Sequence, residues 1–405
     1  MPSELARHWT LDAGVDFLNH GSFGATPGVV LAAQQAWQAR MEREPVRFMV
    51  EDLERELDRA RRVLGGFVGA DPDDLAFVPN ASTGVNTVLR SLRFAPGDEI
   101  LTTDHEYNAV KNAIEYVCER DGATMAVAPL PFPISSADEA CAAVLAGVTP
   151  ATRLVVLDHV TSATALVMPL EPILAQLAAR GVDTLIDGAH APGMVALDVA
   201  ALGATYYSGN LHKWTCAPKG TAFLWVRRDR QPMIRPLTIS HGANAPRTDR
   251  SRFRLEFDWT GTTDPSGYLA VADAIAFGDT LLAGGWPALR ARNRTLALEA
   301  RDLLCAALGV ERPAPDEMIG SMASVPLGWE SGPAVVQGVS LYGDDLHDAL
   351  LAERIQVMVT PWPQRPDGGP WRRLVRVSAA AHNDRAQFER LAEMLVRLVG
   401  PFRHG

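Results

Sequence analysis

Residues 152–190, TRLVVLDHVTSATALVMPLEPILAQLAARGVDTLIDGAH, decide the predicted fold. The stretch begins with an apolar, β-rich run (152–160) and passes through a helix-like segment, EPILAQLAARG (171–181). It ends with a second apolar run (183–190). Gly181 suits the end of a helix, because glycine tolerates the left-handed conformation found there. Strands that alternate with helices are typical of an α/β fold with parallel strands.

The same alternation of strand-like and helix-like segments extends along the chain in both directions. Several runs show no alternation of polar and apolar residues, as expected for strands that are covered on both faces. We therefore predict an α/β fold with a mostly parallel seven-stranded sheet and flanking helices. No helix separates the last two runs, so the last strand can be antiparallel. The five further strand-like runs are 74–80, 97–104, 124–130, 204–210 and 221–228.

Helical segments flank this central region. Two lie ahead of it, at 28–44 and 49–69, and a long one follows at 265–308, broken near AGGWP. Mixed strand-like and helical segments then run to the end and predict a smaller α+β domain. The expected limits are an N-terminal arm, a large domain and a small C-terminal domain, at residues 1–26, 27–275 and 276–405.

Composition excludes several classes of function. The 405 residues are 47% hydrophobic and 21% charged, as in a globular protein with a substantial core. The net charge of −10, without a long basic run, argues against nucleic acid and anionic membranes as partners. No apolar stretch reaches membrane-span length, and the N-terminus does not resemble a signal peptide. Four scattered cysteines without metal or redox spacing favour a reducing cytoplasm.

Polar residues cluster where the predicted strands end. Ligands bind at the carboxyl ends of strands in an open parallel sheet, so several such turns together predict an active site, although each alone is best explained as a cap. The turn NASTGVN (80–86) suits an anion at a helix N-terminus and matches neither a dinucleotide nor a Walker loop. The residues are Asn80 to Thr83; Asp104 to Tyr107; His159, Thr161 and Ser162; Asp187 and His190; and Ser208, His212 and Lys213.

Asp187 and Lys213 carry the most specific chemistry. A carboxylate at the end of the apolar strand TLID needs a cation or donors, which a protonated pyridine nitrogen, an arginine or a helix cap could supply. Lys213 lies in SGNLHKWTCAPKG (208–220), a half-buried, aromatic turn that lowers an amine's pKa and makes it nucleophilic toward a carbonyl. With the anion-binding turn, these two residues indicate pyridoxal 5′-phosphate (PLP) held as a Schiff base.

Three motifs, LIDGAHAPG (185–193), YYSGNLHKW (206–214) and GTTDPSGYLAV (261–271), resemble fold type I PLP enzymes of the class V aminotransferase family. Within that family, FLNHGSFGATP (17–27), DHEYNAV (104–110) and DHVTSATA (158–165) resemble the isopenicillin N epimerase branch. The resemblance covers most of the chain and is weakest over 305–370.

The resemblance implies a role for each cofactor-binding residue. Lys213 forms the Schiff base, Asp187 pairs with the ring nitrogen, and His190 lies near the phenolic oxygen. Either His105 or Tyr107 stacks on the ring. The predicted phosphate ligands are Ala81, Ser82, Thr83, Ser208 and His212, and Ser162 is a further cofactor contact.

The resemblance also implies a substrate pocket and a homodimer. Asn19, His20 and Gly21 belong to the arm that lines the pocket. Arg376, in VRVSAAAHN (375–383), would bind the substrate carboxylate, for which a planar guanidinium is suited; a solvated strand arginine is the alternative, because Arg372 and Arg373 are close in sequence. Thr262 and Thr263 match a segment that reaches the phosphate of the neighbouring subunit.

The predicted function is a PLP enzyme that acts at the α-carbon of an amino acid or aminoacyl substrate. Epimerisation is favoured, with His105, Tyr107 or His20 as acid on the face opposite Lys213; a β-eliminating lyase, such as a C–S lyase, and an aminotransferase are the alternatives. The loop TPWPQRPDGGPWRR (360–373) lacks the cysteine of desulfurases, and Cys216 is expected to be a small packed residue.

A metal-dependent hydrolase is a remote alternative. It would use ligands drawn from His20, His105, His159, His190, Asp104 and Asp187. No HxH or HExxH spacing supports it, and it leaves Lys213 unexplained.

Overall fold

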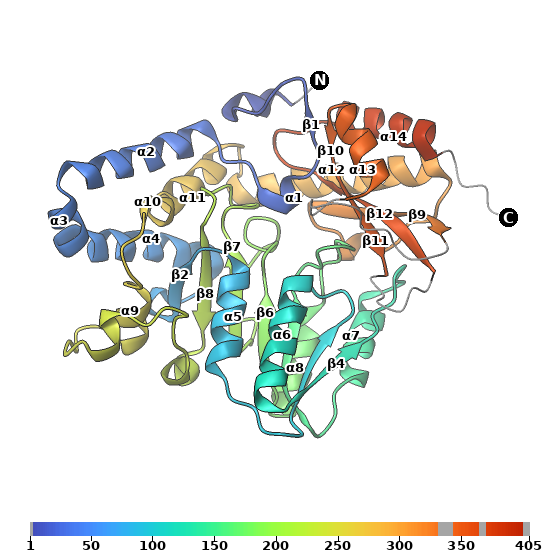
Figure 1. Ribbon diagram of the computed structural model, residues 1–405. Helices are drawn as coiled ribbons and strands as arrows, with labels where there is room; N and C mark the ends of the chain where they lie inside the picture. The colour runs from blue at the N-terminus through green and yellow to red at the C-terminus, as the bar shows by residue number, and fades with distance from the viewer. Residues whose placement is uncertain (1–2, 331–342, 364–369, 400–405) are drawn as a thin grey trace.

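The computed structural model describes residues 3–330, 343–363 and 370–399, and a seven-stranded sheet forms its centre (Figure 1). The strand order is β2-β8-β7-β6-β5-β3-β4. β8 is antiparallel to both of its neighbours, and the other pairs are parallel, which confirms the predicted fold class. The strands are Leu75–Val78 (β2), Glu99–Thr103 (β3), Thr124–Ala128 (β4), Thr152–Asp158 (β5), Asp183–Asp187 (β6), Tyr206–Asn210 (β7) and Ala222–Val226 (β8).

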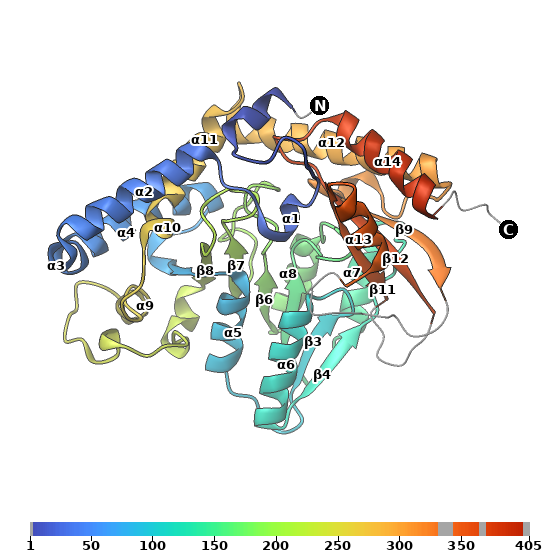
Figure 2. The ribbon, with the colours of Figure 1, turned by 45° about the horizontal axis from the view of Figure 1, so that its top comes forward.

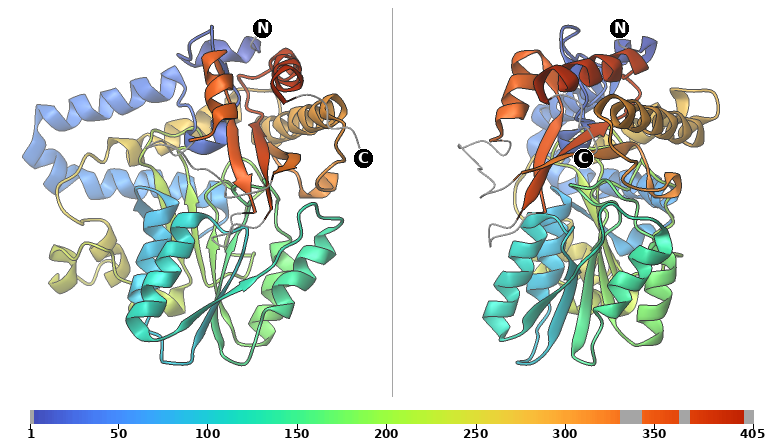
Figure 3. Two further views of the ribbon diagram at one scale, coloured as in Figure 1. Left: turned by 45° about the vertical axis from the view of Figure 1, so that its right-hand side comes forward. Right: turned by 90° about the vertical axis from the view of Figure 1, so that its right-hand side faces the viewer.

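Both faces of the sheet are buried under helices, which explains the apolar runs without alternation. In β5, Leu154 and Val156 join one core, and Val155 and Leu157 join the other. Figure 3 shows the sheet between these two layers of helices. The first core includes α5 (Ala81–Ser91) and α6 (Asn108–Asp121), and the second includes α4 (Leu53–Val68), α7 (Ala137–Ala146) and α8 (Leu170–Ala179).

The flanking helices follow the predicted pattern. The N-terminal hairpin consists of α2 (Gly28–Arg43), the short α3 (Pro45–Arg47), a turn of π-helix (Phe48–Asp52) and α4. The long helical stretch is broken before α12, where Gly284 has a φ of 94°. In the described part of the chain, no single helix is long and apolar enough to span a membrane. α10–α11 and α12 reach the required length and composition only when taken together, and they are bent by 72°. The stretch comprises α10 (Ser266–Leu269), α11 (Val271–Thr280) and α12 (Gly285–Leu308).

A second, antiparallel sheet follows, with the order β11-β12-β9; α12 packs against β9 and β12, and α14 (Arg385–Val399) packs against α12. Its strands are Met358–Trp362 (β11), Trp371–Ser378 (β12) and Met322–Glu330 (β9), and α13 (Asp345–Ala352) precedes β11. The predicted boundary at 275–276 falls inside α11. The domain limits therefore stay a prediction, and the predicted C-terminal domain (276–405) includes residues outside the described ones.

A short parallel pair ties the N-terminal segment to the C-terminal part. β1 (Asp16–Phe17) pairs with β10 (Ile355–Gln356), and the carbonyl of Leu18 accepts a hydrogen bond from the Ser378 amide. These contacts place α1 (His20–Phe23) between the two sheets (Figures 1 and 2). Because no periodic pattern marks two-residue strands, the sequence did not predict this pairing.

Candidate active site

The sheet register aligns the candidate residues along one edge. Asp158 lies opposite Asp187 across β5 and β6, and Asp187 lies opposite Ser208 across β6 and β7. Lys213 follows β7 in the next turn. Parallel strands end at the same edge, so residues from three separate stretches of chain meet there.

The amine of Lys213 lies at the centre of this edge. Its Nζ is 3.3 Å from Nε2 of His190. Burial, and then the charge of Arg376, lower the pKa of Lys213 to about 7, against the opposing effect of Asp187 and Asp158. An appreciable fraction of the amine is therefore neutral at neutral pH, in agreement with the lowered pKa expected from the sequence.

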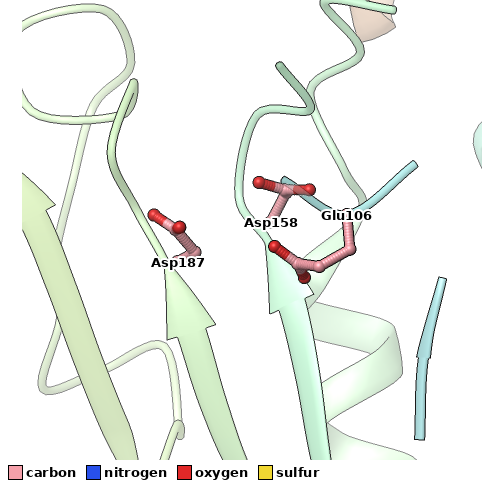
Figure 4. Close-up of side chains that lie close together, drawn as sticks. All are labelled: Glu106, Asp158 and Asp187. Atoms are coloured by element: carbon pink, nitrogen blue, oxygen red, sulfur yellow. The ribbon is translucent and has the colours of Figure 1, made fainter. Parts of the chain in front are cut away.

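Three buried carboxyl groups lie close together at this edge of the sheet (Figure 4). One oxygen from each of Glu106, Asp158 and Asp187 lies within 4.8 Å of the others. Burial raises the pKa of all three, that of Glu106 to about 8, and the negative charges reinforce the effect for Glu106 and Asp158. The three groups therefore share protons rather than all ionise.

Neither Glu106 nor Asp158 had been assigned a role from the sequence. The sequence does carry a signal for Asp158, because this acidic residue ends the apolar run VVLD just as Asp187 ends TLID. Within the described residues, this trio is the only group that could offer three metal ligands, and it contains no histidine. The histidine ligands of the metal-hydrolase hypothesis are not brought together.

The N-terminus of α5 forms the predicted anion-binding turn. Oδ1 of Asn80 caps it by accepting from the Thr83 amide at 2.8 Å. The Ala81 amide donates to Oδ1 of Asn210, also at 2.8 Å. Ala81 is buried, whereas Ser82 and Thr83 keep part of their surface exposed, and the Thr83 hydroxyl donates to Oδ1 of Asn80 at 3.0 Å. A helix N-terminus of this kind suits an anion.

Ser208 does not contribute to this turn. Its hydroxyl donates to the carbonyl of Phe223 at 2.9 Å and is wholly buried against Gly84. The predicted role of Ser208 is therefore not supported. Asn210, which ends β7 and contacts Ala81, occupies the corresponding place and was missed because its side chain points to α5 only in the folded sheet.

His212 remains a candidate ligand beside the turn. Its Nδ1 lies 2.8 Å from the carbonyl of Thr221, and because a carbonyl can only accept, Nδ1 carries a proton. Burial, and then the Lys213 charge, lower the pKa of His212 to about 4. An anion nearby would raise that pKa again.

The structure separates the two candidates for stacking on the cofactor ring. Both ring nitrogens of His105 are engaged, Nδ1 with Oγ1 of Thr164 at 2.8 Å and Nε2 with the carbonyl of Leu130 at 2.9 Å. Its ring is buried edge-on against Trp362. Tyr107 is 45% exposed at the start of α6. His105 is therefore part of the interior, and Tyr107 is retained as the stacking candidate.

His190 is buried next to Lys213 with one nitrogen still unsatisfied. Among the described residues, its Nδ1 has no hydrogen-bond partner. Burial, and then the charge of Lys213, lower its pKa well below the usual range. The neighbouring His159 is engaged elsewhere, since its Nδ1 lies 2.9 Å from the hydroxyl of Tyr207.

Arg376 is 1% exposed, which excludes a solvated strand arginine. It donates to the carbonyl of Ser162 at 2.8 Å, to the hydroxyl of Ser22 at 2.9 Å and to Oδ1 of Asn19 at 3.2 Å. Asn19 thus reaches the expected pocket. Ser162 reaches it through its backbone carbonyl, with its hydroxyl 3.4 Å from the same guanidinium.

The other two residues of the N-terminal motif point elsewhere. Nε2 of His20 lies 3.0 Å from the carbonyl of Lys213, and Nδ1 lies 3.1 Å from Nε2 of His382. The amide of Gly21 donates to the hydroxyl of Ser378, and its Cα packs against Met322. The structure places His20 against the backbone of Lys213 and Gly21 against Ser378 and Met322, and a place for either residue in the substrate pocket stays a prediction.

Thr262 and Thr263 are exposed in the loop before α10. Thr263 lines a hollow together with Thr83 and Thr87. Their predicted contact with a neighbouring subunit stays a prediction.

The site suits the predicted cofactor. It offers an amine of lowered pKa, a helix N-terminus with two hydroxyls, and the unsatisfied Nδ1 of His190. It also offers a buried carboxylate at Asp187, whose side chain accepts a hydrogen bond from the Ala189 amide at 2.9 Å. A cationic ring nitrogen would lower the raised pKa of Asp187 by supplying the missing opposite charge.

Comparisons with known proteins match almost the whole chain. Residues 21–329 match the family model described as aminotransferase class-V. The chain is 36% identical to isopenicillin N epimerase of Amycolatopsis lactamdurans, over 96% of both sequences. It is 31% identical to L-cysteine desulfhydrase of Arabidopsis thaliana, over 80% of this chain and 73% of the relative.

Solved structures share the fold. The cystine C–S lyase C-DES, in complex with its product cysteine persulfide, superposes with a TM-score of 0.76 at 23% identity, over 95% of this chain and 97% of that chain. The cysteine desulfurase CsdA of Escherichia coli gives a TM-score of 0.75 at 18% identity, over 97% of both chains.

Proposed function

The chain belongs to the class V aminotransferase family of fold type I, PLP-dependent enzymes, and we propose that it catalyses β-elimination from an amino acid, as a C–S lyase does. The family resemblance drawn from the sequence is thereby confirmed. The relatives include both epimerases and cysteine desulfhydrases at similar identity, so sequence identity does not distinguish the two reactions.

Lys213 is the proposed base at the α-carbon. When bound, PLP supplies an electron sink that stabilises negative charge at that carbon. The Lys213 amine, with a pKa of about 7, can take the α-proton at neutral pH and then return it to the departing sulfur. For a cysteine-type substrate the Cα–H and Cβ–S bonds break, and hydrolysis of the remaining three-carbon unit yields pyruvate and ammonia.

The surrounding residues bind and orient. Asp187 holds the ring nitrogen, and Ser82, Thr83 and Asn210 surround the phosphate. Arg376 is already fixed by Asn19, Ser22 and Ser162, so its guanidinium is ordered before a substrate carboxylate arrives. Burial of Arg376 keeps water from weakening this contact.

The state of two histidines favours elimination over epimerisation. An epimerase needs an acid on the face opposite Lys213, and His20 and His105 were two of the three candidates. Both have their ring nitrogens engaged within the protein, and burial lowers their pKa to about 4 and about 3, so they are neutral at neutral pH. A neutral imidazole is a poor acid, whereas β-elimination needs a base on one face only.

Epimerisation is the second candidate, and Tyr107 supports it. This residue is the third predicted acid, follows β3 at the same sheet edge and is 45% exposed. Transamination of a dicarboxylate has less support. The further arginines considered are in ion pairs: Arg47 with Glu44, Arg247 with Glu54 and Asp249, and Arg254 with Asp73.

One experiment separates the three outcomes. The PLP-loaded enzyme is incubated with L- and D-cysteine, cystine and a panel of other amino acids in deuterated water. Release of pyruvate, ammonia and sulfide that is lost in Lys213→Ala but retained in Tyr107→Phe supports the proposal. Deuterium at the α-carbon with inversion, abolished by Tyr107→Phe, would establish an epimerase instead. Stoichiometric conversion of PLP to its pyridoxamine form, reversed by a keto acid, would establish a transaminase.

A further inference from the structure

A buried chain of hydrogen bonds runs from the Lys213 backbone through two histidines. The carbonyl of Lys213 lies 3.0 Å from Nε2 of His20, and Nδ1 of His20 lies 3.1 Å from Nε2 of His382. His20 is 1% exposed and His382 is 2% exposed. The three residues come from the turn after β7, from α1 and from the turn between β12 and α14, so the chain joins distant parts of the sequence.

The direction of each hydrogen bond follows from the acceptor at one end. A carbonyl can only accept, so Nε2 of His20 carries a proton. Because burial lowers the pKa of His20 to about 4, its ring is neutral and Nδ1 is a bare acceptor. Nε2 of His382 must then be the donor to it. Both rings are therefore fixed as the Nε2–H tautomer, and removal of the donor would leave Nδ1 of His20 buried without a partner.

The charged groups around the pair also disfavour protonation. Burial is the main cause of the lowered pKa of His382, followed by the charges of His20 and Arg292. Lys219 acts in the same direction on His20, and the thiol of Cys216 lies 3.7 Å from Nε2 of His20. Burial and the neighbouring cations thus hold the pair neutral, against the hydrogen bond to the Lys213 carbonyl, which raises the pKa of His20.

Aromatic rings enclose the pair and hold it in place. Phe17 stacks on His382, with 5.6 Å between ring centroids, and Trp9 meets the same ring edge-on at 5.4 Å. Trp214, the residue after Lys213, lies 5.1 Å from the ring of His20. The indole of Trp9 is itself anchored, since it donates to the carbonyl of Ala25 at 3.0 Å. The rings leave little room for an alternative rotamer.

We propose that His382, acting through His20, is a positioning residue that fixes the backbone of Lys213 and so directs its amine toward the reacting carbon. Neither histidine exchanges a proton with substrate. The inference rests on the proposed function only in taking Lys213 as the cofactor-binding base, and it holds equally for elimination and for epimerisation.

Two variants of His382 form a matched test. His382→Gln can retain an N–H donor toward His20, whereas His382→Leu cannot. Each is loaded with PLP, and two quantities are measured: the apparent dissociation constant of PLP, and the pH midpoint of the visible absorbance of the lysine-bound cofactor. We expect about tenfold weaker PLP binding and a shifted midpoint in His382→Leu, since an unsatisfied buried acceptor costs roughly that factor. His382→Gln should stay within about twofold of the wild type.

Equal effects in both variants, or unchanged affinity and midpoint in His382→Leu, would refute a role that depends on the donor. A merely structural role would lower the thermal midpoint of both variants without moving the absorbance midpoint. Failure of the lyase assay leaves these readouts unaffected, because neither depends on the reaction catalysed.

A measurement on the wild-type protein covers the case in which His382→Leu does not fold. Nitrogen-15 NMR of histidine-labelled protein distinguishes the two neutral tautomers. We expect Nε2–H signals for His20 and His382 at pH 7, with no protonation above about pH 5. An Nδ1–H tautomer, or titration of either ring near its ordinary pKa, would refute the proposed direction of the hydrogen bonds.

Discussion

Replacing Glu106 by glutamine should remove a loss of stability that the cofactor-free protein suffers as the pH rises. Burial and the Asp187 charge raise the pKa of Glu106 from 4.5 to about 8. An acid whose pKa is raised on folding stabilises the protein fully below its unfolded pKa, and this contribution is lost as the pH rises through the folded value. The stability attributable to Glu106 should therefore fall between about pH 4.5 and pH 8.

The size of the effect follows from the same two values. Each pH unit between them costs about 1.4 kcal/mol, so the interval from 4.5 to about 8 sets a ceiling of roughly 5 kcal/mol. Protons redistribute among Glu106, Asp158 and Asp187, and this redistribution reduces the loss of stability. We therefore expect the unfolding free energy to fall by on the order of 2–4 kcal/mol because of Glu106. Glutamine matches the neutral acid in shape and can keep the hydrogen bond from the Tyr107 amide, which is 3.0 Å long.

The assay is urea unfolding of the cofactor-free wild type and Glu106→Gln at pH 5, 6, 7 and 8. Titrating groups outside this trio are common to both proteins, so the difference between the two unfolding free energies reports Glu106 together with its coupling to Asp158 and Asp187. As the pH rises, Glu106→Gln should become more stable relative to the wild type. Glu119→Gln, at an exposed glutamate, serves as the control and should give no such trend. A wild-type and Glu106→Gln difference that is the same at pH 5 and pH 8 would refute the reasoning.

Borohydride treatment of the PLP-loaded protein should abolish its visible absorbance and label Lys213 in a peptide map; a label elsewhere contradicts the assignment. Asp187→Asn should keep the fold by circular dichroism but lose turnover by on the order of 10²–10³-fold, as when one preorganised electrostatic partner is removed; full turnover would overturn its role. Gly24 has a φ of 69°, and a Cβ there would overlap the backbone of the Lys213 turn. Gly24→Ala should therefore cost roughly 2–4 kcal/mol in urea unfolding, more than Gly203→Ala, which has a similar φ of 82° but open space around it; equal costs would contradict the close approach. The exposed segment 262–263 motivates a homodimer, so solution mass should correspond to two chains, and a monomer that holds PLP tightly would refute this.

The local sequence was sufficient for the layered fold and for the chemistry at its centre. Apolar runs separated by helical segments predicted all seven strands, because strand and helix formation follow the nearby pattern of burial. Asp187 could be singled out because a charged group at the end of an apolar run is costly unless it meets a cation or donors, and Lys213 because it lies in a half-buried, aromatic turn. Asn19 and Arg376 were implied only by the family resemblance, and their contact joins residues far apart in sequence.

Only the tertiary structure decided which neighbours each side chain meets. The order of strands places β3 beside β5, which brings Glu106 to Asp158, and no sequence pattern specifies that order. Ser208 and Asn210 are both buried, but the Ser208 hydroxyl lies inside the sheet edge under Gly84, whereas Asn210 ends the strand and its side chain contacts the N-terminus of α5 at Ala81. The sequence predicted His20 and His105 as possible proton donors to the substrate, but hydrogen bonds to residues far apart in sequence engage both nitrogens of each ring. Residue type sets what a side chain can do, and the partners supplied by the folded chain determine what remains available to a ligand.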